Sequence, residues 1–144
     1  MVEIHYQNID EIPGLSSEFL FSWFTEVCKI EGKQLEEVNL IFMSDDDLLE
    51  MNRTHLDHDY YTDIITFDYC EDDLILGDLF ISVDRVKDNA SEFNVSFGEE
   101  LKRVCVHGVL HLCGYGDKSE EDEKLMRSKE NQMLELTVSR ETLI

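Results

Sequence analysis

The sequence has one proline, no run of basic residues and no long apolar stretch. Pro13 is alone, and no linker, repeat or low-complexity tract divides the 144 residues, so we expect a single domain spanning 1–144. No segment approaches the roughly 18 apolar residues of a membrane helix. The N-terminal segment has neither a basic start nor an apolar core, so no signal peptide is expected. These absences predict a cytoplasmic protein without a membrane partner.

The four cysteines show no metal-binding or redox pattern. Cys28, Cys70, Cys105 and Cys113 lie in apolar segments and form no CxxC pair. We interpret them as reduced, mostly buried thiols of a cytosolic protein. A chain of this length can bury a core of its own, so folding needs neither disulfides nor a structural metal.

Positive charge is also scarce. The chain has 33 acidic and 12 basic residues, a formal net charge of -21. A nucleic-acid-binding protein usually carries a basic patch, so this composition counts against RNA or DNA as a ligand. If RNA binds, a few local cations and a metal ion must overcome a repulsive field. The acidity also has a simpler interpretation, as an aid to solubility.

Periodicity and capping signals predict an α+β domain. Alternating or β-branched segments predict strands at 2–6, 37–43, 63–69 and 76–83. Helical spacing and serine caps predict helices from Ser16 or Ser17 to Ile30, from Ser44 to His55, from Asp84 to Asn94, over 97–113 and from Ser119 to Leu136. We therefore expect a small mixed four-stranded sheet packed by about five helices.

The most informative motif is the pair His107 and His111 on the most apolar predicted helix. Four residues advance a helix by about 400°, so both imidazoles leave the same face one turn apart. That spacing suits two ligands of one metal ion, although helical histidines can also be merely packed or exposed. Unpaired imidazoles would be costly to bury among the apolar neighbours, which favours the metal site on this central helix.

A glycine-rich break follows the histidines and precedes a carboxylate. Gly114 and Gly116 permit positive φ, so the chain can fold back and bring Asp117 to the same metal. Two imidazoles and one carboxylate leave a coordination position for water, which is typical of a catalytic site. Zinc peptidases of the HExxH type keep their general base directly after the first histidine. Gly108 stands there instead, which disfavours peptide hydrolysis.

These residues resemble the YbeY family. The family signature HGxLHLxGYDH stands here as HGVLHLCGYGDK, over 107–118. Asn52 with 62–67 (TDIITF) is similar to the family's N…TDVLSF segment, 76–79 (LGDL) to its LGD strand, and Met126 and Glu130 to its closing helix. The matched motifs cover about residues 50–134. The resemblance implies a single-strand-specific, metal-dependent endoribonuclease in rRNA maturation and ribosome quality control, with rRNA and the small ribosomal subunit as partners.

The chain departs from the family pattern at two positions. Asp117 stands where a third histidine is usual, and Gly116 replaces the aspartate before it. A carboxylate can bind zinc, so one zinc ion per chain is still expected. Two histidines and one carboxylate also resemble a non-haem iron site, so another transition metal is possible. Leu56 occupies the position of a family arginine, to which the resemblance assigns contact with the scissile phosphate.

Two arginines are candidates for that missing cation. Arg103 precedes His107 by four residues and so shares the ligand face, while Arg53 lies in the preceding segment. Each can also be an ordinary solvated charge. His55, His58, Asp63 and Asp78 are interpreted as loop, turn or hydrogen-bonding residues. No residue stands out as a general base.

Two rival functions remain open. One is a metal-dependent hydrolase of a small acyl or amide substrate, which suits the acidic surface and the missing arginine. The other is a ribosome assembly factor whose metal is structural and whose catalysis has lapsed.

Overall fold

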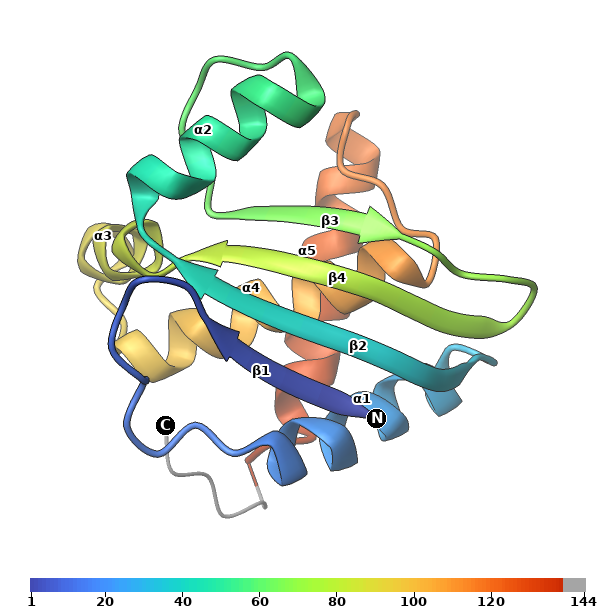
Figure 1. The fold of residues 1–144 in the computed structure, drawn as a ribbon. Coiled ribbons are helices and arrows are strands. Elements are labelled where there is room, and N and C mark those ends of the chain that lie inside the picture. The colour runs from blue at the N-terminus through green and yellow to red at the C-terminus, as the bar shows by residue number, and fades with distance from the viewer. Residues whose placement is uncertain (139–144) are drawn as a thin grey trace.

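A computed structural model describes residues 1–138, so the predicted domain boundary at residue 144 lies outside the described residues. Four strands form one sheet in the order β1-β2-β4-β3 (Figure 1). They are β1 (Val2–Tyr6), β2 (Gln34–Met43), β3 (Ile64–Asp68) and β4 (Leu74–Ser82). β2 is parallel to β1 and β4, whereas β3 is antiparallel to β4. The prediction of a small mixed sheet is confirmed.

Two strands begin earlier than the apolar pattern indicated. β2 starts at Gln34 and β4 at Leu74, where Gln34 pairs with Leu74 and Leu35 with Ile75. Gln34, Glu36 and Glu37 are exposed, so hydrophobicity carries no signal there. The backbone hydrogen bonds between strands do not depend on whether the side chains face solvent or core. The start of β2 can therefore pair with β4 without an apolar sequence pattern.

Within residues 1–138 the predicted number of helices, five, is confirmed. They are α1 (Ser17–Ile30), α2 (Asp45–Leu56), α3 (Val83–Phe93), α4 (Phe97–Leu112) and α5 (Glu120–Glu135). Each follows a serine whose hydroxyl accepts a hydrogen bond from the backbone N–H three residues later, an N-cap. The caps are Ser16, Ser44, Ser82, Ser96 and Ser119. Ser82 ends β4 and caps α3 at once, so helix and strand meet without a loop.

The main core lies between one face of the sheet and the helices α1, α4 and α5, which stand behind the sheet in Figure 1. Trp23 of α1 is fully buried and its Nε1 donates to the Met133 carbonyl of α5 at 2.9 Å. This bond fixes α5 to α1 and, through it, to the rest of the core. No helix of the described part is long and apolar enough to cross a membrane.

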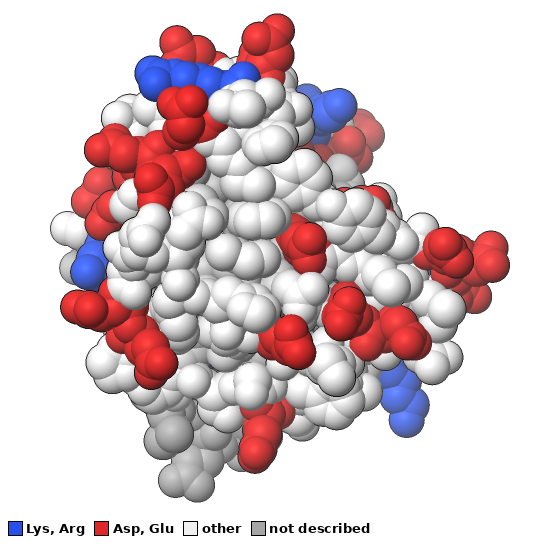
Figure 2. Space-filling view, in the orientation of Figure 1, with Lys and Arg blue, Asp and Glu red and all other residues white. Residues whose placement is uncertain are grey.

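Acidic side chains outnumber basic ones on the face drawn in Figure 2. They lie along its upper and left edges and at its right-hand tip, several more lie across its middle, and cations are few. The four cysteines, all in the described part, are free thiols, and Cys28 and Cys105 are buried. Cys70 and Cys113 are partly exposed, so burial is confirmed for two of the four cysteines, and their reduced state stays a prediction.

Candidate metal centre

The helix α4 and the loop after it bring three potential ligands together. His107 and His111 project from one face of α4, with ring centroids 4.6 Å apart. Asp117 Oδ2 lies 3.2 Å from His111 Nε2 and 3.6 Å from His107 Nε2. Among the described residues this is the group of three side chains whose ligand atoms all lie within 4.8 Å of one another.

These separations fit one tetrahedral metal ion. Zinc–nitrogen and zinc–oxygen bonds of about 2.0–2.2 Å at tetrahedral angles place neighbouring ligand atoms about 3.3 Å apart. The two separations from Asp117, 3.2 and 3.6 Å, bracket that value. The side chains of His107 and His111 are 22% and 25% exposed, so the donor atoms are shielded but still reachable.

The side chains of His107, His111 and Asp117 form the metal group. The backbone returns to this group through a single glycine. Gly114 has φ +110°, a conformation that residues with a Cβ rarely adopt, whereas Gly116 has no positive φ. The N–H of Tyr115 donates to the Leu110 carbonyl at 3.1 Å and closes the end of α4. The position of Asp117 therefore depends on the conformation of Gly114. The positive φ that was also expected at Gly116 is not observed.

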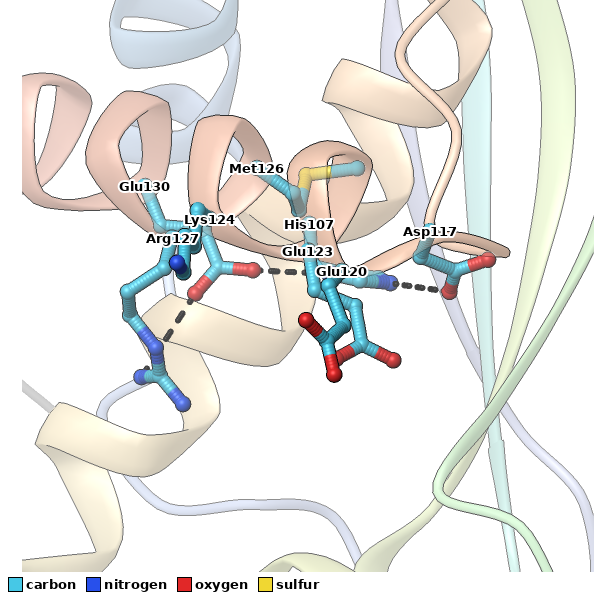
Figure 3. Close-up of a pocket in the computed structure, with 8 residues that line it drawn as sticks. All are labelled: His107, Asp117, Glu120, Glu123, Lys124, Met126, Arg127 and Glu130. Carbon is cyan, nitrogen blue, oxygen red and sulfur yellow. Dashed lines mark hydrogen bonds and ion pairs between the residues drawn. The ribbon is translucent and has the colours of Figure 1, made fainter.

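Glu130 of α5 orients the first histidine. Its Oε2 lies 2.7 Å from His107 Nδ1, and Figure 3 shows His107 held between Glu130 and Asp117. Burial alone would raise the pKa of Glu130, but hydrogen bonds from His107 and Arg103 lower it below its ordinary value. Burial alone would lower the pKa of His107, but Glu130 raises it. An ionised Glu130 accepts from Nδ1–H, so in the neutral imidazole Nε2 faces Asp117 with a free lone pair.

A backbone carbonyl orients the second histidine. His111 Nδ1 lies 2.8 Å from the carbonyl oxygen of Tyr115, which can only accept, so Nδ1 carries the proton. The Tyr115 hydroxyl donates to Glu31 Oε1, and Lys129 Nζ binds Glu31 Oε2 at 3.1 Å. Glu31 thus fixes the loop that holds this carbonyl. Both imidazoles present Nε2 to one point.

Gly108 lies close to the side chains of the sheet. A Cβ at this position would lie 2.8 Å from Ile64 Cδ1 and 2.9 Å from both methyl carbons of Leu79. A larger residue would therefore require the ends of these two side chains, which lie between α4 and the strands β3 and β4, to shift. The glycine leaves the position without the glutamate base of the HExxH type, which agrees with the argument against peptide hydrolysis.

Comparison with known proteins decides the family. Residues 5–137 match the family described as Endoribonuclease YbeY. The chain belongs to the YbeY family. Proteins named Endoribonuclease YbeY from Phocaeicola vulgatus and Flavobacterium psychrophilum are each 49% identical, covering 88% and 94% of this chain and 91% and 96% of those proteins. A solution structure from Thermotoga maritima superposes with TM-score 0.67 at 32% identity, covering 94% of this chain and 87% of that one. The predicted resemblance is confirmed.

The two candidate arginines occupy different surroundings. Arg103 Nη1 donates to Glu130 Oε1, and Nη2 donates to Asn131 Oδ1, both at 2.9 Å. Arg103 therefore holds in place the carboxylate that contacts His107. Arg53 pairs with Asp59 and is half exposed, with Glu50 3.9 Å away. Arg53 does not line the cavities that contain His107.

Sequence reasoning missed several residues around the metal group. Glu130 matched a family helix, but nothing in its local sequence tied it to His107. Arg127 also lines the cavity of Figure 3, with its side chain 57% exposed and 3.7 Å from Glu130. Asp63, interpreted as a turn residue, shares a cavity with His107, and burial raises its pKa. Contacts between residues this distant in the chain leave no spacing pattern to detect.

Of the three hollows in the described part of the chain that contain His107 and Asp117, two are the larger. One, of about 770 Å³, lies against α5 and is lined by His107, Asp117, Glu130 and exposed charged residues (Figure 3). The other, of about 590 Å³, lies against the loop between α2 and β3, and it also contains His111. Leu56, at the position of the family arginine, lines this second hollow. A substrate can thus reach His107 and Asp117 from either side, and His111 from the α2 side.

Proposed function

We propose that this chain is a metal-dependent endoribonuclease that cleaves single-stranded RNA during rRNA maturation. The observation that carries the proposal is the open three-residue group, with each imidazole oriented by a separate acceptor. Relatives at 49% identity are named endoribonucleases, which supports the reaction class.

We further propose that His107, His111 and Asp117 hold one zinc ion per chain. Their separations suit tetrahedral coordination, and nitrogen with carboxylate oxygen is an ordinary donor set for zinc. The same set suits non-haem iron, so elemental analysis of purified protein is part of the test. A bound ion would supply Lewis-acid charge to the scissile phosphodiester and would acidify water.

Three arginines are candidates for the cation that we propose to hold the scissile phosphate. Arg103 and Arg53 were chosen on sequence grounds, and Arg127 is added because its exposed guanidinium lines the cavity with His107 and Asp117. An arginine that holds phosphate supplies two parallel N–H donors, whereas Arg103 already uses two nitrogens on Glu130 and Asn131. This favours Arg127 for phosphate and Arg103 for support of Glu130.

Alanine variants of the three arginines separate these roles. We expect Arg127→Ala to reduce RNA turnover at unchanged metal content, because it removes a phosphate contact and no support of a ligand. Arg103→Ala should reduce metal affinity and turnover together. Arg53→Ala, whose guanidinium pairs with Asp59, serves as the matched control and should change neither. Full turnover in all three variants would remove arginine from the proposal.

The proposed setting is the cytoplasm, with the small ribosomal subunit as the assembly on which the enzyme acts and ribosome quality control as a further role. Purified protein should cleave single-stranded RNA, and a chelator or His111→Ala should abolish cleavage. Co-sedimentation with small subunits without cleavage of any RNA would instead favour a non-catalytic assembly factor. Hydrolysis of a small ester or amide without RNA cleavage would favour the other rival.

A further inference from the structure

The hollow beside α2 contains an exposed aromatic pair at the metal group. The loop between α2 and β3 contributes His58 and Tyr60 to the same hollow as His107, His111 and Asp117. The rings of His58 and Tyr60 are stacked, with centroids 5.2 Å apart and planes at 21°. Tyr60 is 56% exposed, so the supported ring retains a large surface that nothing in the described chain covers.

The backbone of this loop is held in place although its rings are exposed. Asn52 is 1% exposed, and its Nδ2 donates to the Tyr60 carbonyl at 2.9 Å. The Asn52 carbonyl in turn accepts from the His58 N–H at 3.1 Å. The neighbouring Tyr61 is held elsewhere, because its hydroxyl donates to Asp46 and Arg85 lies 5.4 Å from its ring centroid. The exposed pair is therefore ordered before any ligand arrives.

Charge makes phosphate contacts a weak source of affinity on this side. Lys118 is the one lysine or arginine among the described residues that line the hollow, and Asp63, Asp68 and Asp117 line it too. Leu56 adds apolar surface. A protein of net charge -21 that takes RNA here needs an attraction that does not depend on neutralising phosphates. Stacking of a base on an aromatic ring supplies roughly tenfold to hundredfold affinity per base.

We propose that His58 and Tyr60 form a stacking platform for one unpaired nucleobase next to the cleaved phosphodiester. This inference rests on the proposed function, since it names the feature of RNA that the same site recognises. Bases in a duplex are already stacked and their faces are unavailable, whereas unpaired bases can be splayed onto a side chain. The platform therefore provides a preference for single strands.

The test measures binding of a short fluorescent single-stranded RNA to metal-stripped protein, so that no cleavage interferes. We expect Tyr60→Ala to weaken binding about tenfold or more and Tyr60→Phe, which keeps a flat ring, to stay within about twofold. Tyr69→Ala removes a similarly exposed tyrosine outside the hollow, 58% exposed, and should bind like the wild type. Metal content after reloading should be equal in all four proteins.

A second arm tests stacking directly. RNAs in which single nucleotides are replaced in turn by an abasic one should include a position that weakens binding to the wild type but not further to Tyr60→Ala, because the two changes remove one contact. Wild-type affinity in Tyr60→Ala, together with RNA cleavage by the wild type, would overturn the platform and leave the proposed function intact. An equal loss in Tyr69→Ala would also overturn it. A wild type that neither binds nor cleaves RNA would overturn both.

Discussion

The two hollows beside the metal group differ in the partners and the exposure of the side chains that line them. On the α5 side, Glu130 is 5% exposed and pairs with His107, Arg103 and Arg127. On the α2 side, His58 and Tyr60 contact each other, and Tyr60 exposes more than half of its surface. The difference indicates a division of labour. A buried carboxylate on one side orients His107, while exposed rings on the other remain available to substrate.

The largest effect is expected from the two histidines of the metal group. His107→Ala or His111→Ala should abolish metal binding, because each removes one of three donors that lie within 4.8 Å of one another. Metal content by elemental analysis is the measurement. The exposed His55→Ala, on α2, is the matched control and should retain about one ion per chain. Full metal in both ligand variants would refute the site.

Asp117 should behave as a ligand and not as a turn residue. Asp117→Ala is expected to weaken metal binding more than about a hundredfold, beyond the usual loss for a residue outside the ligand set. Asp117→His should keep zinc, because imidazole is an equivalent donor and Gly114 leaves the loop conformation unchanged. Competition with a chromogenic chelator gives both affinities. An unchanged metal affinity in Asp117→Ala would show that the carboxylate belongs to the turn and does not bind the metal.

Glu130, on the α5 side, should influence the metal more than the substrate. Glu130→Gln is expected to lower metal affinity about 10-fold to 100-fold, because a neutral amide supports the His107 Nδ1–H less strongly. Glu123→Gln makes the same change in the same hollow on an exposed residue and should have no effect. A lower affinity of metal-stripped Glu130→Gln for single-stranded RNA would contradict the assignment of Glu130 to the metal and of the exposed rings to the substrate.

The smallest expected effect concerns stability. Glu100 is 5% exposed, and burial raises its pKa above the ordinary value. The folded state therefore binds this proton more tightly than the unfolded state, so stability falls as pH rises from the unfolded to the folded pKa. Glu100→Gln should unfold at a higher temperature than the wild type at neutral pH, and the difference should disappear in acid. A thermal denaturation series across pH measures it, and a difference independent of pH would contradict this assignment.

The sequence predicted most of the fold and the three side chains that the structure brings together, but not the residues that orient them. Serine caps and periodicity found every helix and strand of residues 1–138, because those signals are local. The pairing of His107 with Glu130 and of Tyr115 with Glu31 joins residues 23 and 84 positions apart, so only the packed structure reveals it. Gly108 stood out as a missing base, whereas its contact with Leu79 is a tertiary fact.

The central claim is that one metal ion on His107, His111 and Asp117 drives RNA cleavage. The most direct measurement is titration of zinc into metal-stripped protein while cleavage of a single-stranded RNA is followed in the same sample. We predict that turnover rises with bound zinc and saturates at one ion per chain, and that Asp117→Ala requires far more zinc to reach any activity. Cleavage that persists in the stripped protein, or that is absent from the fully loaded one, would contradict the account.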